Sequence, residues 1–406
     1  MATKKHIIRL AALAAAILSA HACIYPYDPE IRQDGELPIV VEGDIHIGGS
    51  TVLYVSYVHP FEEQVYTAPR IQGYLEGEDG TRIDGVYNTS STGNTMYMPA
   101  IRALLDFDTS GLSDTQRYRV HFETLDGETV QNTFESEWLD VCPAPVIDGL
   151  SYSLHEEFDE LWIGLSMHCN GAHHFRWSFS ETWEYHSDLY SNWEYNPQTF
   201  TVSKYPQGSP NLYYCWSSGA SPNINIFSTA NQIDDRFEEL AFHTIPRTSS
   251  RLQILYRITV RLEAMSEMAY NYWNNMKQNS EGQGSIFAPV PSEMASNIRC
   301  LSDPTIQVVG YLNAASQTEA SMYYDDGVEH FYRRPYVVDL PSVKVTSGNI
   351  DSLALLYARG YLPYDAIYED TPTVPKYYLW STSRCIDCRK SGGTKDKPEG
   401  WPNNDK

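Results

Sequence analysis

IVVEGDIHIGGSTVLYVSYV, residues 39–58, contains two runs of β-branched and aromatic residues separated by a pair of glycines. The runs, Ile39 to Ile47 and Thr51 to Val58, have the composition that favours extended backbone. Gly48-Gly49 between them is typical of a tight turn. The stretch therefore predicts a β-hairpin at the beginning of the folded chain.

Further strand-like runs follow this hairpin at short intervals. We expect them at residues 71–76, 82–87, 117–124 and 129–138. Glu78-Asp79-Gly80 and Asp126-Gly127 supply turn residues between them. Short strands at this spacing, without helical periodicity, predict a β-sandwich over residues 39–142. The two prolines of Cys142-Pro143-Ala144-Pro145 interrupt strand pairing and mark its end.

Residues 143–384 are predicted to form a larger β-rich domain. Strands are expected at residues 161–168, 174–182, 251–264, 305–312 and 319–324. One amphipathic helix is expected near residues 266–279, with Ser266 as its N-cap. Its apolar stripe consists of Met268, Ala269, Tyr272, Trp273 and Met276. The predicted fold is mainly β, and residues 385–406 are predicted to be a polar C-terminal tail.

The N-terminus has the order of a secretory signal. Three basic residues precede the apolar run Leu10 to Leu18, which is too short to span a bilayer. Cys23 follows directly after the small residue Ala22, and this position predicts a lipoprotein leader at residues 1–22 and acylation of Cys23. Simple cleavage after Ala22 is the alternative and would release the chain. Residues 23–38, acidic and containing prolines, are predicted to be a tether.

The chain is strongly acidic, with 52 Asp and Glu against 29 Lys and Arg, a formal net charge of −23. Removal of a leader that carries three basic and no acidic residues would change this to −26. Such a surface repels nucleic acid. The 30 tyrosines and nine tryptophans are typical of extracytoplasmic β proteins that present aromatic rims to a partner.

Six cysteines remain if Cys23 is acylated, and an even number outside the cytoplasm predicts three disulfides. They are Cys142, Cys169, Cys215, Cys300, Cys385 and Cys388. The sequence leaves the connectivity open. The C-x-x-C spacing of the last two would also suit a redox couple or half of a zinc site. No second C-x-x-C or H-x-x-x-H accompanies it, so we expect neither a metal nor another cofactor.

Groups of aromatic, proline, glycine and cysteine residues recur along the chain as landmarks. They are Cys23 with Tyr25-Pro26-Tyr27-Asp28-Pro29, Val40-Val41-Glu42-Gly43, Arg176-Trp177, Glu181-Thr182-Trp183-Glu184-Tyr185, Cys215-Trp216, Tyr272-Trp273, Gly284-Ser285-Ile286-Phe287, Pro291-Ser292, Asn297-Ile298, Val309-Gly310-Tyr311, Cys385-x-Asp387-Cys388, Gly392-Gly393, Lys397-Pro398 and Trp401. Together they resemble DUF4249, a family of Bacteroidetes lipoproteins with a domain of unknown function. The resemblance implies a cell-surface outer-membrane lipoprotein, encoded beside a TonB-dependent transporter and assisting it in nutrient capture.

The leading hypothesis is a lipid-anchored binding protein for a small molecule, glycan or peptide. Trp183, Tyr185, Trp193 and Tyr195 lie in a stretch rich in Ser, Asn and Pro, where stacked rings could hold a ligand. The alternative for Trp183 and Tyr185 is that they complete a core strand.

Two other classes of function stay open. A structural subunit of an outer-membrane complex would have the same sequence features. A hydrolase is less favoured, because no nucleophile elbow, metalloprotease helix or phosphate loop is present. Its candidate residues would be Glu156, Glu157, Asp159, Glu160, His168, His173, His174 and His186.

Overall fold

The stretch that opens the fold forms three strands, because Gly43 interrupts the first predicted run. They are β1 (Ile39–Glu42), β2 (Ile45–Ile47) and β3 (Ser50–Tyr57). Gly43 has φ +141°, and a Cβ there would lie 2.5 Å from the carbonyl oxygen of Val52, so that only glycine fits. The break separates the two halves of the run. β1 pairs with β3, whereas β2 pairs in parallel with β22 (Ala314–Asp325).

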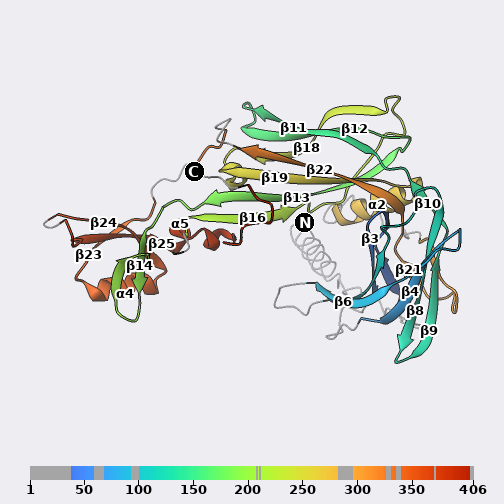
Figure 1. Ribbon diagram of the computed structural model, residues 1–406, viewed down its shortest axis with the longest axis horizontal. Helices are drawn as coiled ribbons and strands as arrows, with labels where there is room; N and C mark the ends of the chain where they lie inside the picture. The colour runs from blue at the N-terminus through green and yellow to red at the C-terminus, as the bar shows by residue number, and fades with distance from the viewer. Residues whose placement is uncertain are drawn as a thin grey trace, which may run out of the picture. The chain divides into compact units, whose positions relative to one another are not determined.

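The computed structural model describes residues 38–58, 68–92, 100–206, 209, 212–281, 296–325, 331–334, 340–369 and 372–402 (Figure 1). The predicted leader, Cys23 and residues 23–37 of the tether lie outside these ranges. Residues 38–406 form one compact unit. The mainly β fold is confirmed, with 53% of residues in strands and 11% in helices. No helix in the described ranges is long and apolar enough to cross a membrane.

Strands of two sheets contribute to the first hydrophobic core. The first sheet has the order β21-β1-β3-β7-β6, with β6 (Val86–Thr92), β7 (Ala100–Asp108) and β21 (Val308–Val309). The second set consists of β4 (Arg70–Gly77), β5 (Arg82–Asp84), β8 (Arg117–Asp126), β9 (Thr129–Ser136), β10 (Leu139–Cys142) and β20 (Ile298–Cys300). Alternate side chains from both meet in this core, among them Val55, Phe107, Val120, Phe122 and Phe134.

Two strands of this region come from far along the chain, beyond the boundary predicted at residue 142. β20 pairs with β9, and β21 pairs in parallel with β1. Gly310 directly after β21 has φ +140°, and a Cβ there would lie 2.0 Å from the carbonyl oxygen of Val41. The predicted strand at 305–312 is therefore reduced to the two residues of β21. Because β20 and β21 pair with strands that precede residue 142, the predicted boundary at that residue does not divide the chain into parts with separate contacts.

The central region consists of two layers of antiparallel strands (Figure 1). One layer has the order β16-β13-β19-β22, and the other β11-β12-β18. The new strands are β11 (Val146–His155), β12 (Glu160–His168), β13 (His174–His186), β16 (Tyr214–Ala220), β17 (Asn225–Ser228), β18 (Arg236–Pro246) and β19 (Leu255–Ala264), with the 3-10 turn η1 (Ser250–Leu252) before β19. Phe175, Phe179, Ile258 and Val260 point between the layers, so the opposite face of β13 and β19 carries most of their polar residues.

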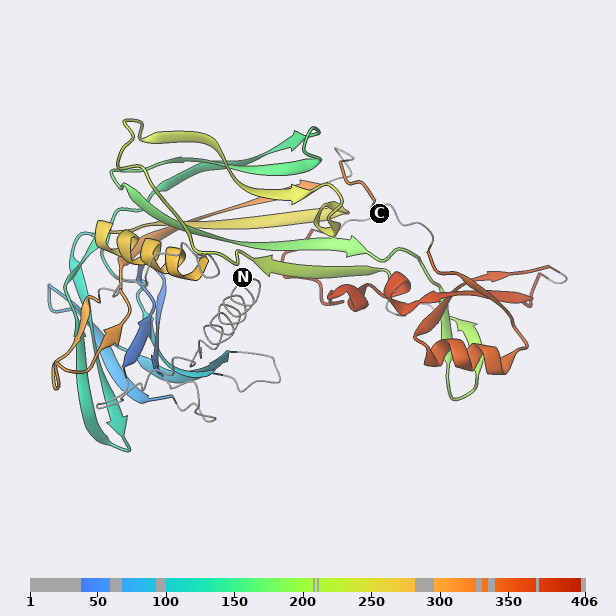
Figure 2. The same cartoon turned by 180° about the vertical axis from the view of Figure 1, so that it is seen from behind.

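The helix α2 (Glu267–Glu281) confirms the predicted helix and lies on that opposite face (Figure 2). The Ser266 hydroxyl accepts a hydrogen bond from the Ala269 backbone N–H at 3.1 Å, as an N-cap does. Ala269 and Tyr272 are buried. Met268 does not belong to the packed stripe, because it lies about 90° around the helix axis from its centre and is 59% exposed.

The strands β14 (Trp193–Asn196) and β15 (Thr201–Lys204) and the residues beyond β22 form a further small core that the sequence did not predict. Its other elements are β23 (Val343–Thr346), α4 (Ile350–Ala358), β24 (Tyr361–Ile367) and β25 (Tyr377–Thr382). Tyr195, Val345, Leu353, Tyr378 and Trp380 pack together in it.

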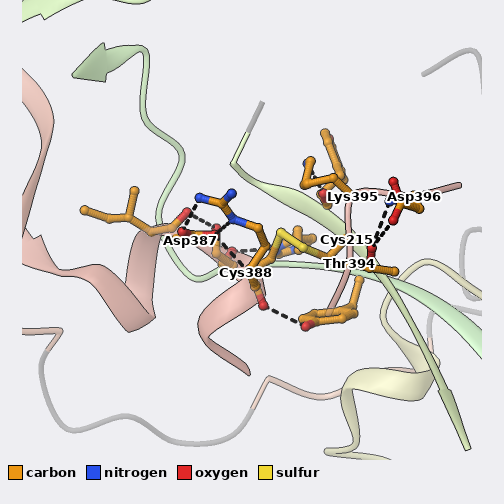
Figure 3. Close-up of a disulfide and its surroundings, with 12 residues drawn as sticks. Cys215, Asp387, Cys388, Thr394, Lys395 and Asp396 are labelled. Carbon is orange, nitrogen blue, oxygen red and sulfur yellow. Dashed lines mark hydrogen bonds and ion pairs between the residues drawn. A yellow bond between two sulfur atoms is a disulfide. The ribbon is translucent and has the colours of Figure 1, made fainter. Parts of the chain in front are cut away.

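Residues 385–406 were predicted to be a tail, but residues 385–402 are folded onto the central sheet. They include the end of α5 (Ser383–Ile386) and η2 (Cys388–Ser391). A disulfide joins Cys388 to Cys215 of β16 (Figure 3). Thr394 bridges to Trp216, and the indole of Trp401 donates to Glu184 Oε2 at 3.0 Å. Although this segment is polar in composition, three of its side chains are buried in the hydrophobic core, those of Ile386, Cys388 and Trp401.

Candidate binding cavity

The four aromatic residues predicted to hold a ligand lie on strands rather than on one loop. Trp183 and Tyr185 are on β13, and Trp193 and Tyr195 are on β14. Tyr185 is 4% exposed and donates a hydrogen bond to the Cys388 carbonyl at 2.8 Å. Tyr195 is 8% exposed and packs against Trp380. Trp183 and Trp193 are half-buried in separate clusters, so these four rings do not form one site.

The structure contains one disulfide among the six candidate cysteines instead of the expected three. Cys215 and Cys388 are bonded, while Cys142, Cys169, Cys300 and Cys385 carry free thiols. The C-x-x-C pair is therefore not a disulfide, since its second cysteine bonds elsewhere. Burial, reinforced by Asp140 and other acidic neighbours, raises the pKa of the Cys142 thiol to about 11. This thiol stays protonated at neutral pH.

The residues considered for a hydrolase are dispersed. His168 contacts Asp148 at 3.1 Å, His186 contacts the Ser187 carbonyl at 2.7 Å, and Asp159 pairs with Arg333 at 3.4 Å. Within the described residues, no three His, Cys, Asp or Glu side chains gather closely enough to hold a metal ion.

A cavity of about 340 Å³ lies on the polar face of the central sheet, where β2, β13, β19 and α2 meet. We call it the polar cavity. Its lining residues are His46, Arg176, Trp177, Ser178, Ser221, Asn223, Ile224, Asn225, Arg261, Glu263, Trp273 and Gln317. They come from stretches of the sequence that lie far apart, and most of them have polar side chains.

An ionic cluster forms the inner wall of the polar cavity. Arg176 and Glu263 are cross-strand partners on β13 and β19, and the guanidinium donates to the Glu263 carboxylate. The same guanidinium donates to Asp44 and lies 4.7 Å from the ring centroid of Trp273. Asp44 is oriented by the Asn313 backbone N–H, which donates to Oδ1 at 2.9 Å. The cluster thus fixes the N-terminal strands and α2 on the central sheet.

Three polar atoms on residues that line the cavity are buried and have no hydrogen-bond partner in the described structure. They are His46 Nδ1, Glu263 Oε2 and Trp273 Nε1. Glu263 is only 4% exposed, and its Oε2 lies 3.6 Å from His46 Nδ1, beyond hydrogen-bonding distance. Buried polar groups are normally hydrogen-bonded, and leaving one unpaired costs about 1–3 kcal/mol. Three such atoms lie on residues around one small cavity, which makes it the candidate binding site.

Burial and the neighbouring charges shift the pKa values of Glu263 and Arg176. Burial raises the pKa of Glu263, although the positive charge of Arg176 opposes this shift. Burial alone would lower the pKa of Arg176, but the negative charges of Asp44 and Glu263 outweigh it and raise that pKa. The guanidinium therefore stays charged, and Glu263 is the group of the pair that takes up a proton as the pH falls.

A second buried carboxylate, Glu181, lies between the two layers of the central region. Its Oε2 accepts from the Tyr256 hydroxyl at 2.9 Å and lies 3.4 Å from His243 Nε2. Arg251 lies 3.1 Å from Oε1. Burial alone would raise the pKa of Glu181, but the hydrogen bond from His243 and the charge of Arg251 lower it below the ordinary value. Both oxygens of the Glu181 carboxylate therefore have partners, and the network has the character of a structural one.

Sequence reasoning missed the polar cavity, although signals for its residues were present. Arg176-Trp177 and Tyr272-Trp273 are among the landmarks of the family resemblance. Along β19, every second residue is polar, and Glu263 stands between two apolar neighbours. Alternation of this kind indicates a polar sheet face. It does not indicate which other segments cover that face.

Comparison with protein families matches residues 24–321 to the model of DUF4249, a domain of unknown function. The chain belongs to the DUF4249 family. The matched range contains every residue of the polar cavity, whereas Cys385, Cys388 and Trp401 lie beyond it.

Other comparisons give little further information on this DUF4249 protein. No curated protein matches it. A solved structure of a DUF4785 family protein from Legionella pneumophila is similar over 55% of this chain at 10% sequence identity, with a TM-score of 0.19. The chain spans about half the length of that protein, 51%. A likeness at this level supports no argument about fold or function.

Proposed function

We propose that this DUF4249 protein is a lipid-anchored binding protein of the outer-membrane surface that holds a small polar ligand in the polar cavity. The observation that carries the proposal is the group of buried atoms without a hydrogen bond at His46, Glu263 and Trp273. A ligand that met these atoms would remove the cost of their burial, so part of its binding energy would come from the wall itself.

The three atoms define the chemistry that the ligand must offer. Glu263 Oε2 needs a donor, Trp273 Nε1 needs an acceptor, and His46 Nδ1 can be either according to its tautomer. A hydroxyl group both donates and accepts, so a ligand rich in hydroxyl groups would match all three. The proposal is therefore recognition without chemical conversion, by a wall whose polar groups are already fixed by the ionic cluster.

The proposed place of action rests on the sequence. The leader at residues 1–22 and Cys23 support acylation and anchoring, and a double or triple acyl anchor binds a membrane stably. The family resemblance supports a TonB-dependent transporter as the partner. In this proposal, the binding protein captures the ligand at the cell surface and passes it to that transporter. A structural subunit with no ligand of its own is the alternative.

The test combines partner capture with ligand binding, using the full-length chain carrying a C-terminal tag. The chain is recovered from detergent-solubilised outer membranes, and the retained proteins are identified by mass spectrometry. We expect a TonB-dependent transporter at near-equal stoichiometry. Small molecules extracted from the purified complex are then identified. We expect them to be retained by the wild-type chain and lost from Glu263→Gln, in which one carboxylate oxygen of the wall becomes an amide.

A matched control is Glu78→Gln, because Glu78 is 48% exposed and pairs with Arg117 outside the polar cavity. It should retain both the transporter and the ligand. Recovery of the transporter without any ligand, unchanged in Glu263→Gln, would favour the structural subunit. Recovery of a ligand without a transporter would keep the binding function and remove the proposed partner.

A further inference from the structure

A second, smaller pocket lies on the same polar sheet face as the polar cavity. It measures about 190 Å³ and is lined by Ser180, Thr182, Arg257, Thr259, Arg261 and Glu319. We call it the arginine pocket. Arg261 lines both pockets, so the two are neighbours along β13 and β19.

The arginine pocket combines hydroxyl groups with a guanidinium that has no acidic partner among the described residues. Arg261 pairs with Glu319 at 2.7 Å, and the Thr259 hydroxyl shares a hydrogen bond with Ser321 at 2.8 Å. Arg257, by contrast, forms no ion pair with any described residue. Its guanidinium lies 5.8 Å from the ring centroid of Tyr323, its cross-strand neighbour on β22. In a chain with a net charge of −23, an arginine that pairs with no described carboxylate is available for an anion from outside.

We propose that the arginine pocket is an oxyanion subsite and that the ligand spanning both pockets is an acidic oligosaccharide. This inference rests on the proposed binding function of the polar cavity. Arg257 would bind a carboxylate or sulfate group through a bidentate pair of hydrogen bonds, and the Thr182 hydroxyl opposite it on β13 would donate a further one. The hydroxyl groups of the sugar would form hydrogen bonds with His46, Glu263 and Trp273 in the polar cavity.

The geometry of the face favours a saccharide over an acidic peptide. A bound peptide commonly adds a strand to a sheet edge, where its backbone finds free N–H and C=O groups. Both pockets instead lie on the face of paired strands, where β13 and β22 flank β19 and the backbone groups are already used. What this face offers is side-chain hydroxyls, guanidiniums and carboxamides. Glu263 and Arg257 are six residues apart on one strand, so a ligand that contacts both must span about 20 Å.

The test measures binding of four defined probes to the full-length chain in detergent by titration calorimetry. The probes are tetragalacturonate, a sulfated galactose tetrasaccharide, its neutral counterpart and tetraglutamate. We expect the acidic saccharides to bind at least about 10-fold more tightly than the neutral one, which is the effect of one charge-assisted contact. Arg257→Gln should remove this preference, so that acidic and neutral saccharides bind with equal affinity. Arg257→Lys should retain part of it. Glu263→Gln should weaken all saccharides.

The control is Arg299→Gln, because Arg299 is 72% exposed on β20 and lines neither pocket. It should bind like the wild type. Equal binding of acidic and neutral saccharides, unchanged by Arg257→Gln, would overturn the oxyanion subsite but keep the polar cavity. Preference for tetraglutamate would replace the saccharide by an acidic peptide. If no probe binds, while molecules extracted from native membranes still depend on Glu263, the ligand class is wrong and the proposed function stands. Preference of the uronate or of the sulfated probe identifies the acidic group.

Discussion

Cys215 and Cys388 are 173 residues apart in the sequence, yet a disulfide joins them with their Cα atoms 5.7 Å apart. Both cysteines are fully buried, and Tyr185 covers them on one side. The bond connects β16 to the short helical turns at the end of the chain (Figure 3). It thereby closes a loop that contains β17, β18, β19 and β22 of the central region and β23, α4, β24 and β25 of the small core, whereas β11 to β15 lie outside this loop.

Removal of this disulfide by Cys215→Ser should lower the free energy of unfolding by about 2–5 kcal/mol, because a long loop is no longer constrained in the unfolded chain. Urea denaturation under oxidising conditions measures the loss. A reducing agent should destabilise the wild type by a similar amount and leave the variant unchanged. Cys385→Ser is the matched control, since Cys385 is a free thiol three residues away. An equal loss in that variant would mean that the pairing is wrong.

Replacement of Arg176 by Gln should lower the free energy of unfolding by about 3–5 kcal/mol, because it leaves two buried carboxylates without a cation. Asp44 and Glu263 have side chains only 4% and 5% exposed. The loss should shrink on acidification, since the carboxylates can then be protonated. Denaturation at neutral and acidic pH measures both effects.

The control for this prediction is Arg261→Gln on the same sheet face. Arg261 and Glu319 are 47% and 48% exposed, so their ion pair should contribute less than about 1 kcal/mol. Similar losses in both variants would show that burial does not strengthen the Arg176 cluster.

The sequence predicts much of the fold where side chains alternate along a strand. β8 reads Arg-Tyr-Arg-Val-His-Phe, and its buried residues Tyr118, Val120 and Phe122 follow this alternation. The N-cap of α2 at Ser266 is equally local. In contrast, the parallel pairing of β21 with β1 and the bond between Cys215 and Cys388 depend on contacts between distant segments. No local pattern encodes such contacts.

The candidate site illustrates the same limit. Aromatic residues in a polar stretch suggested a ligand site at Trp193 and Tyr195, but α4 and β25 cover these rings. The polar cavity depends on segments that lie far apart in the sequence and meet around Arg176. Asp44, Glu263 and Trp273, which contact Arg176, each have an ordinary local sequence context. The amino-acid composition could indicate that polar and aromatic residues form the site. Only the tertiary structure shows where these residues come together.

Tyr195→Ala should lower stability by about 3 kcal/mol through loss of a buried ring, and it should not change ligand binding to the polar cavity. Tyr195 contacts Trp380 and Tyr357 in the C-terminal core, at centroid distances of 5.4 Å and 5.0 Å. Thermal unfolding and ligand titration separate the two effects. Weakened binding by a variant of undiminished stability would restore the loop-site hypothesis. Tyr190→Ala is a suitable comparison, since Tyr190 is 49% exposed.

Gly310→Ala should lower stability by more than about 2 kcal/mol, because the new methyl group would collide with the Val41 carbonyl and the residue would keep a strained positive φ. The pairing of β21 with β1 should loosen first. Hydrogen exchange of the Ile39 amide, which donates to the Gln307 carbonyl at 3.0 Å, reports this pairing. Gly49→Ala is the control, since a Cβ at Gly49 meets no atom within 4 Å. Normal protection of Ile39 in Gly310→Ala would contradict the prediction.

The Glu181 network should make the chain sensitive to acid. Because the pKa of Glu181 is lowered in the folded state, the unfolded chain binds more protons than the folded chain in the range below the ordinary value of 4.5. The stabilisation is complete above that ordinary value and is lost as the pH falls through the lowered one. Urea denaturation at pH values from about 6 down to about 3 should therefore show a falling free energy of unfolding. In Glu181→Gln, which cannot titrate, this part of the fall should be absent, and the stability at neutral pH should be lower because Arg251 and His243 lose their carboxylate. Glu319→Gln, an exposed carboxylate in a surface pair, should keep the wild-type acid profile. If Glu181→Gln retains that profile as well, the acid sensitivity arises from other carboxylates, and the network around Tyr256 does not hold a charged Glu181.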